Sequence, residues 1–270
     1  MRYAMLQNTR RQERAENEGG PFAMAMMHYK TGRIHDHLPP PVPDLATYAT
    51  KPLPAPPDEV DVPGANLKNW GMDLNDTYGD CTIAGADHIG EADCAVAKEQ
   101  YHAPSSAVIE RTYFGLTGGA DSGLVMSAVL KAWRATGLFG QKLAAYAPVH
   151  AQNTTLVQQC IAWFGAAYIG VNLPKPAEGQ FSPDGTGVWD LTGTSADNQI
   201  EGGHCVAPVG YRSDGSVQAV TWGAIVTITP AWWSKYVEEV WATITEPFVL
   251  RSGDARGLSL STLEADLAAA

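Results

Sequence analysis

Apolar residues recur with helical spacing through the first half of the globular part of the chain, which begins near Trp70. Four segments combine this spacing with helix start or stop signals. Ser105 or Ser106 would cap the second segment, and Gly137 would close the third. The four segments are residues 81–100, 105–116, 124–137 and 154–165. Four helices in succession predict a helical lobe.

The pattern becomes strand-like after residue 165. "AAYIGVNLP" predicts a strand, and a loop rich in Gly, Pro and Asp follows from 175 to 203. "HCVAPVGY" and "VQAVTWG" flank the turn "RSDGS", which predicts a β-hairpin. "AIVTI" and "VWATIT" are expected strands around a short helix that runs to about residue 239, with Thr229 as N-cap and Pro230 at its first position. The fold class predicted is α+β, with an N-terminal helical lobe and a C-terminal β-rich lobe.

Residues 1–66 have a different character, because prolines interrupt them repeatedly. Such a stretch cannot hold a long helix or a central strand, so we expect an extended Pro-rich N-terminal arm. A disordered tail is the alternative, but the apolar run "PFAMAMMHY" favours an arm that docks on its own globule or on a neighbour. The prediction is an arm (1–66), a globular domain (67–250, with lobes of about 67–165 and 166–250) and a tail (251–270), which is a short helix or a frayed end.

Composition narrows the possible partners. The chain of 270 residues has a net charge of −11, and an acidic surface repels phosphates, so nucleic acid is an unsuitable partner. No apolar run approaches the roughly 18–20 residues of a membrane span, and the first residues lack the apolar core of a secretory signal. We therefore expect no membrane association and a cytoplasmic or virion-associated protein.

The cysteines Cys81, Cys94, Cys160 and Cys205 are far apart and form no CxxC pair. A zinc site of the usual spacing is not expected, and free thiols in an intracellular setting are favoured. Whether Cys94, Cys160 and Cys205 pair stays open.

The stretch "NDTYGDCTIAGADHI" places Cys81 where a turn through Gly79 and Asp80 enters a helix. Peptide N–H groups at a helix N-terminus stabilise a thiolate and later an oxyanion. Cys81 is therefore a candidate nucleophile, with a buried structural cysteine as the alternative.

A histidine supplies the missing base. "EGGHCVAPVGY" puts His204 at the mouth of a strand, after glycines (Gly203 among them) that let a substrate or the opposite lobe approach closely. A helix-borne Cys81 and a strand-borne His204 suit a thiolate–imidazolium pair across an interlobe cleft. An ordinary hydrogen-bonded strand histidine is the alternative.

These motifs resemble those of the papain-like cysteine peptidases over about residues 70–245. "NDTYGDCT" is similar to the family's "QGxCGSCW", "HCVAPVGY" to "HAVAVVGY", and "VTWG" to "NSWG". In the general character of its sequence the chain also resembles short papain-fold proteins of bacteria and phages. The resemblance implies the papain-like two-lobe fold, an oxyanion-donating role for Asn75, and a Trp222 that shields the Cys–His pair from water.

Three departures qualify the resemblance. The family's imidazole-orienting Asn falls on Val220, which cannot hydrogen-bond, and Thr221 is expected to point to the other face of the strand. The residue that orients His204 therefore stays open. Asp80 replaces a small residue and would raise the pKa of Cys81 unless it points away, as it would if it capped the helix. The family's disulfide cysteines and long helical pro-segment have no clear match.

Other side chains are weaker candidates. His88 with Asp87 and Glu91 suggests a metal site, but a core or interface histidine is favoured. His35 and His37 are interpreted as a loop pair rather than a metal site. "GGADSG" lacks the Lys-Ser/Thr of a P-loop. No metal and no cofactor are predicted.

Two functions follow. The first is a papain-like cysteine hydrolase that cleaves a peptide or amide bond of a protein substrate through an acyl-enzyme, with transferase chemistry open to the same residues. The second is a papain-fold binding or structural module, such as a virion or assembly component, that its arm anchors to a partner or to a second copy. An arm that covers the cleft as an inhibitory segment would also fit.

Overall fold

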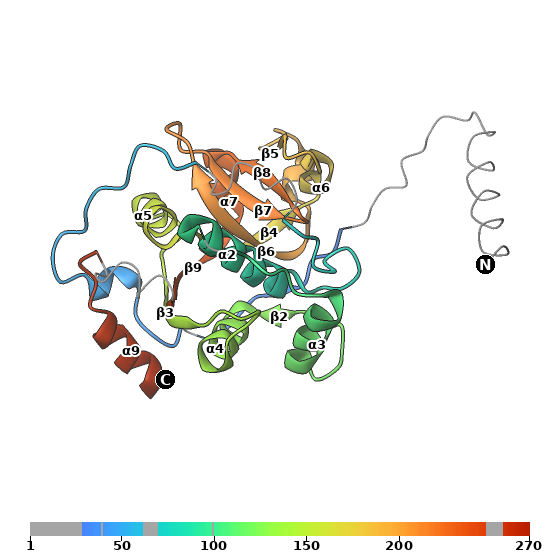
Figure 1. Cartoon of the computed structure of the whole chain (residues 1–270). Coiled ribbons are helices and arrows are strands. Elements are labelled where there is room, and N and C mark those ends of the chain that lie inside the picture. Colours follow the sequence, from blue (N-terminus) through green and yellow to red (C-terminus); the bar gives the residue numbers. More distant parts are fainter. Residues whose placement is uncertain (1–28, 39, 62–69, 99, 247–255) are drawn as a thin grey trace, which may run out of the picture.

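The architecture is a seven-stranded sheet beside a smaller group of helices (Figure 1). A computed structural model of the chain describes residues 29–38, 40–61, 70–98, 100–246 and 256–270, and every structural statement here concerns these residues. The strand order is β3-β9-β4-β6-β7-β8-β5. The α+β class predicted from the sequence is confirmed.

Helix α2 (Cys81–Ala97) lies between the two parts of the molecule (Figure 1). Strand β6 packs on one side of it, and α3 (Ser106–Thr117) and α4 (Met126–Thr136) lie on the other. This explains why most of its side chains are small and buried. A Cβ atom on Gly85, for example, would lie 3.1 Å from Cys205 Sγ. The helix therefore separates the sheet from α3 and α4, and Cys81 lies in its first turn.

The predicted run of four helices is interrupted by a strand that the sequence analysis missed. Strand β3 (Leu143–Pro148) pairs with β9 (Val237–Thr245) and forms one edge of the large sheet. Helix α5 (Thr154–Phe164), capped by the Asn153 side chain, consequently packs on the sheet and not on α3 and α4. The alanines of "LAAYAP" carry little intrinsic strand preference, so the pairing with β9 decides their conformation.

The β-rich part follows the predicted order with one refinement. The expected hairpin is formed by β6 (Ile200–Tyr211) and β7 (Val217–Thr221), with β4 (Ala167–Pro174) and β8 (Ala224–Ile228) beside them. The segment expected to be a loop contains short elements and the beginning of β6. These elements are α6 (Pro176–Gln180), β5 (Gly187–Trp189) and the 3₁₀ helix η2 (Ser195–Asn198).

Helices α7 and α9 lie in the segments where the sequence analysis placed helices. The Thr229 side chain accepts a hydrogen bond of 3.2 Å from the Trp232 amide and caps α7 (Pro230–Tyr236), which ends before residue 239 because β9 begins there. The last helix, α9 (Leu260–Ala269), occupies the predicted C-terminal position. None of the helices in the described ranges has the length and apolar character that a bilayer-spanning helix needs.

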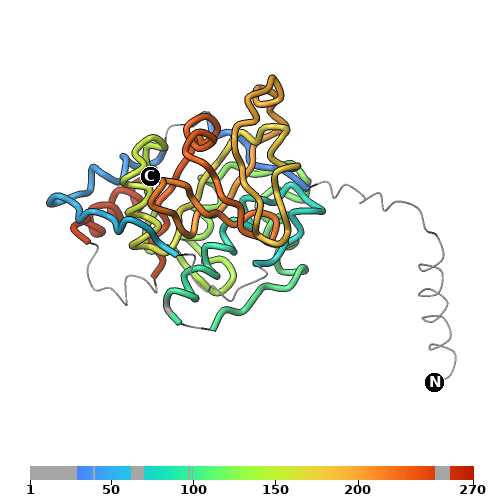
Figure 2. The backbone as a smooth tube through the Cα atoms, turned by 90° about the horizontal axis from the view of Figure 1, so that it is seen from above, coloured from blue at the N-terminus to red at the C-terminus, as the bar shows by residue number. Residues whose placement is uncertain are grey.

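The described part of the arm contacts the rest of the chain. Strand β1 (Arg33–Ile34) pairs in parallel with β2 (Leu124–Val125), and the 3₁₀ helix η1 (Leu45–Tyr48) lies beside α9. The Tyr48 hydroxyl donates to an Asp266 carboxylate oxygen at 2.9 Å. Most of the apolar run "PFAMAMMHY" lies outside the described residues. Figure 2 shows the described arm segments, coloured blue, running along the globule.

The substitution Trp189→Ala is expected to lower the free energy of unfolding by about 3–5 kcal/mol. The ring is fully buried, stacks on Trp232 at 4.8 Å and donates to the Ala177 carbonyl at 2.9 Å. Urea unfolding measures the change. Val188→Ala is the control, because this neighbour in β5 is 44% exposed and should cost less than about 0.5 kcal/mol. Equal losses in the two variants would contradict the packing described for β5.

Candidate active site

Cys81 is the first residue of α2 and is fully buried. Burial raises the pKa of its thiol to about 12, and the backbone amide of Cys205, which donates toward the sulfur, opposes that rise. The Asp80 carboxylate raises this pKa further, while the Arg33 and Gly32 amides also lower it. The thiol is therefore protonated at neutral pH in this state, although the three backbone amides partly oppose the rise in its pKa.

His204 lies on β6 immediately before Cys205, the residue whose amide faces the Cys81 sulfur. Its ring stacks on Trp222 with centroids 4.7 Å apart, and its Nε2 lies 2.8 Å from Thr221 Oγ1. Burial lowers the pKa of the imidazole to about 3, and the nearby His88 adds to the shift. Within the described ranges its Nδ1 has no hydrogen-bond partner.

The expectation that Thr221 points to the other face of its strand is wrong. In the β6–β7 ladder Ala207 faces Val220, so the next pair is Val206 with Thr221. Residues that face each other in an antiparallel pair share a face, and so do residues two apart on one strand. His204 and Thr221 are therefore on one face, while Val220 is on the other. Thr221 hydrogen-bonds the imidazole, whereas the resemblance placed the imidazole-orienting residue at position 220.

Gly32 of the arm lies between Gly203 of β6 on one side and Gly79 and β2 on the other. Gly32 donates to the Gly203 carbonyl at 3.1 Å and accepts from the Leu124 amide at 2.9 Å. A Cβ atom on Gly32 would lie 1.8 Å from the Gly79 carbonyl oxygen, and one on Gly203 would lie 2.2 Å from the Arg33 carbonyl oxygen. These glycines let the arm's backbone cover the sulfur. No hydrogen bond joins Cys81 to His204 within the described ranges.

Aromatic contacts hold the preceding arm residues in place. Tyr29 stacks on the other face of Trp222 with centroids 4.6 Å apart and meets Phe181 edge-on at 5.1 Å. The Trp222 indole donates to the Lys30 carbonyl at 3.3 Å. Trp222 is thus enclosed between Tyr29 and His204, and its role as a shield of a Cys–His pair stays a prediction.

Asn75 and Asp80 form a buried pair behind the cysteine. The Asn75 side-chain amide donates to Asp80 Oδ1 at 3.2 Å and to the Tyr78 carbonyl at 3.3 Å. The amide is therefore engaged here, and a role at an oxyanion stays a prediction. Asp80 is the N-cap residue of α2, but its carboxylate makes no capping hydrogen bond. Of the two alternatives, the carboxylate therefore raises the pKa of Cys81. Burial raises the pKa of this carboxyl to about 8.

The remaining histidine candidates have structural partners. His88 is buried, donates from Nε2 to the Gly71 carbonyl at 3.0 Å and lies 3.3 Å from Asp73 Oδ2. This supports the interface interpretation. His35 and His37 have ring centroids 4.9 Å apart. Within the described ranges no group of three or more His, Cys, Asp or Glu side chains is arranged to hold a metal ion. None of the four cysteines forms a disulfide in the structure.

One buried charge in the cleft escaped the sequence analysis. Arg33 of the arm forms ion pairs with Glu238 and Glu239 of β9. No local motif joins residues more than two hundred positions apart, and only the passage of the arm across the sheet brings them together.

The stability of the fold is expected to fall as pH rises from about 4 to about 8, and Asp80→Asn should flatten this dependence. The pKa of Asp80 is about 8 in the folded chain against 3.8 for an ordinary carboxyl, so across this window the unfolded chain binds fewer protons than the folded chain. Asparagine keeps the oxygen that accepts from Asn75. Urea unfolding at pH 5 and pH 8 measures the effect, and Asp76→Asn, in the preceding turn, is the exposed control. An unchanged pH dependence in Asp80→Asn would contradict the assignment.

No protein-family model and no curated protein matches the sequence. Solved structures do match the fold. Xylellain, a cysteine protease from Xylella fastidiosa, superposes with a TM-score of 0.58 at 17% identity, over 80% of this chain and 97% of that one. The digestive procathepsin L2 proteinase of Tenebrio molitor gives 0.53 at 12% identity, over 89% of each chain. Procathepsin B S9 of Trypanosoma congolense superposes with a TM-score of 0.52 at 13% identity, over 91% of this chain and 99% of that one.

The three superpositions extend over 80%, 89% and 91% of this chain. The likeness concerns the course of the backbone. The sequence motifs around Cys81, His204 and Trp222 had independently indicated the same fold. The chain has the fold of the papain-like cysteine proteases.

Proposed function

We propose that this protein is a cysteine hydrolase of peptide or amide bonds, held latent in the described state by its own arm. The observation that carries the proposal is the setting of Cys81. Its sulfur lies at the N-terminus of a long helix, where the amides of Cys205, Arg33 and Gly32 lower the pKa of the thiol. His204, whose ring Thr221 and Trp222 hold in place, directly precedes Cys205. This combination suits a thiolate nucleophile, although the cysteine is also part of the buried core.

Departure of the arm would convert the pair from neutral to ionic. The arm excludes water from both groups, and burial is the largest cause of the raised pKa of Cys81 and of the lowered pKa of His204. Water that replaces residues 29–34 would reduce both shifts, so the proton can pass from sulfur to imidazole. In the tautomer whose Nε2–H donates to Thr221 Oγ1, the lone pair on Nδ1 accepts this proton.

The reaction then follows from the positions of these groups. The Cys81 thiolate attacks a carbonyl carbon, and the oxyanion is stabilised by amides at the start of α2, including that of Cys81. The protonated His204 gives its proton to the leaving amine as the C–N bond breaks, which leaves a thioester on Cys81. Water, deprotonated by His204, hydrolyses the thioester and releases the acid. An amine in place of water would give transfer instead.

Glycine at position 32 makes the latency testable in the full chain. In Gly32→Ala the new Cβ would lie 1.8 Å from the Gly79 carbonyl oxygen. This clash prevents the arm from keeping its position over Cys81. The rate of Cys81 alkylation by iodoacetamide at pH 7 should rise by more than about 100-fold, because the thiolate fraction grows tenfold for each unit by which the pKa falls toward the free-thiol value. Mass spectrometry of the Cys81 peptide measures this rate.

Gly115→Ala is the matched control, since nothing lies within 4 Å of a Cβ added there. Adding His204→Ala to Gly32→Ala should abolish labelling below about pH 6, and Cys81→Ala in the same background should abolish cleavage of fluorescent casein. If Gly32→Ala labels with an inflection near 8.5 whether or not His204 is present, and no casein is cleaved, the protein is a papain-fold binding module and not an enzyme.

In the Gly32→Ala background, Thr221→Val is expected to lower kcat/KM for casein about three- to tenfold, the value of one buried hydrogen bond. Valine has the shape of threonine but cannot bond His204 Nε2. Thr221→Ser, which keeps the hydroxyl, should retain most of the activity. A full-activity Thr221→Val variant would show that the imidazole is oriented by something else. The pH profile of Cys81 labelling gives a second readout, because a loosened imidazole weakens the ion pair.

A further inference from the structure

Arg33 is a buried cation with two carboxylate partners. Its side chain is only 1% exposed. Its Nε and Nη2 each lie 3.1 Å from Glu239 Oε2, and its Nη1 and Nη2 lie 3.4 Å from Glu238 Oε2. Taking a guanidinium out of water is costly unless charged partners replace the water. The fold supplies those partners at one place beside the cleft.

A glycine makes the room for the guanidinium. Gly170 on β4 is the register partner of Glu239 on β9. A Cβ atom on Gly170 would lie 2.1 Å from Arg33 Nε and 2.8 Å from Arg33 Cζ. Any other residue at position 170 would therefore fill the space. We call this space, bounded by Gly170, Glu238 and Glu239, the acidic pocket.

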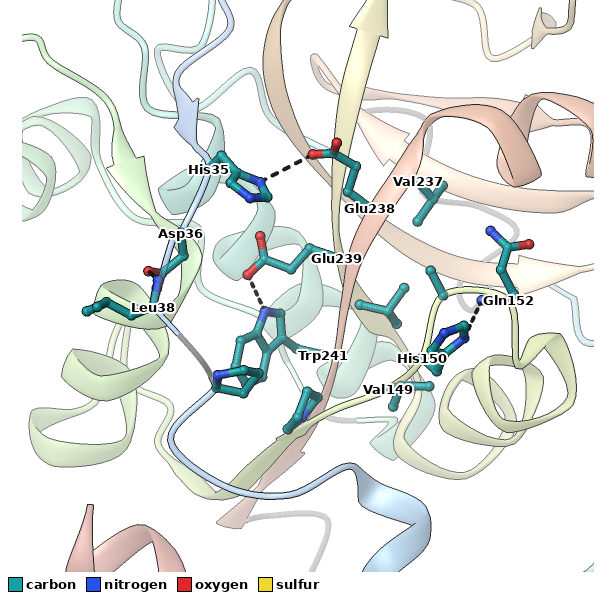
Figure 3. Close-up of a pocket in the computed structure, with 14 residues that line it drawn as sticks. His35, Asp36, Leu38, Val149, His150, Gln152, Val237, Glu238, Glu239 and Trp241 are labelled. Atoms are coloured by element: carbon teal, nitrogen blue, oxygen red, sulfur yellow. Dashed lines mark hydrogen bonds and ion pairs between the residues drawn. The ribbon is translucent and has the colours of Figure 1, made fainter.

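The two carboxylates are held by groups other than Arg33. The Trp241 indole donates to Glu239 Oε1 at 2.6 Å, and the Asn172 side-chain amide donates to Glu238 Oε1 (Figure 3 shows the Trp241 bond). None of these residues belongs to the arm. The acidic pocket would therefore keep its shape when the arm leaves, with two adjacent negative charges and no cation between them.

The acidic pocket is next to the reacting sulfur. The backbone amide of Arg33 itself donates toward Cys81 Sγ, so the residue that meets the sulfur is the one whose side chain enters the pocket. A hollow of about 420 Å³ continues from the carboxylates toward the surface, between His35, Asp36 and Leu38 of the arm and the β9 residues Glu238, Glu239 and Trp241 (Figure 3). Release of the arm would open the pocket and this hollow together.

We propose that the enzyme selects substrates with an arginine side chain beside the scissile bond, and that Arg33 occupies the place of that side chain in the latent state. The inference rests on the proposed function. Arginine is preferred to lysine, because a planar fork can reach both carboxylates at once whereas an ammonium is a single point of charge. The net charge of −11 adds a general attraction for basic peptides.

The test uses the full chain with Gly32→Ala and internally quenched peptides in which one arginine is moved along an otherwise uncharged sequence. Citrulline, the neutral isostere of arginine, replaces it in a matched set. At one position within two residues of the cleaved bond, kcat/KM should be roughly 10–100-fold higher for arginine than for citrulline, as expected for charge-assisted hydrogen bonds. Lysine should lie between them. Equal rates for arginine and citrulline at every position would overturn the inference and leave the hydrolase standing.

Variants locate the effect. Adding Glu239→Gln should reduce the arginine-to-citrulline ratio at least about tenfold, and Glu238→Gln should reduce it less, because the Glu238 side chain is 34% exposed against 16% for Glu239. Glu264→Gln, on α9 and away from the pocket, is the control. A ratio that survives Glu239→Gln would contradict the assignment of the pocket.

A second readout separates this inference from the proposed function. Should no peptide be cleaved, arginine and citrulline peptides are compared as protectors of Cys81 against iodoacetamide. Protection by the arginine peptide at a concentration at least about tenfold lower supports the acidic pocket without any turnover. Equal protection by the two peptides overturns it. Catalysis and recognition can therefore fail independently.

Discussion

The close passage of the arm's backbone over Cys81 is the constraint on which the described state depends. Gly32 touches the Gly79 carbonyl on one wall and pairs with Gly203 on the other, where a single added carbon would collide. Water has no room at the sulfur, so the thiol and the imidazole both stay neutral. The perturbed pKa values of the site are therefore a consequence of the arm's fit rather than of the catalytic residues themselves.

The same passage organises its surroundings over several residues. Tyr29 completes a stack with Trp222 and His204, and Arg33 fills the acidic pocket. These anchors lie on either side of Gly32 and differ in kind, one aromatic and one ionic. A change of conditions that weakens one of these contacts leaves the other in place.

Under the two proposals, the position of the acidic pocket would link inhibition to substrate recognition. An inhibitory segment that uses the substrate's own pocket competes directly with substrate, and its charge complements the pocket for the same physical reason. The parallel pairing of β1 with β2 gives the arm its direction across the cleft. A single set of side chains on β4 and β9 thus accounts both for how the arm is held and for which peptides would replace it.

Local sequence indicated Cys81 and His204 separately, each from the residues around it. The turn before Cys81 and the residues Ser105 and Thr229 are short-range signals, and the structure begins helices where they indicate. The strand that carries His204 was also expected, but it begins at Ile200, within the segment expected to be a loop. The α+β class followed from the change of hydrophobic period. Tertiary structure alone decided the rest. Register brought Thr221 to His204, pairing with β9 turned "LAAYAP" into a strand, and the path of the arm joined Arg33 to Glu239. These contacts link residues that no local pattern connects, because strand register and the seating of a distant segment depend on the free energy of the assembled core and not on any single stretch of the chain.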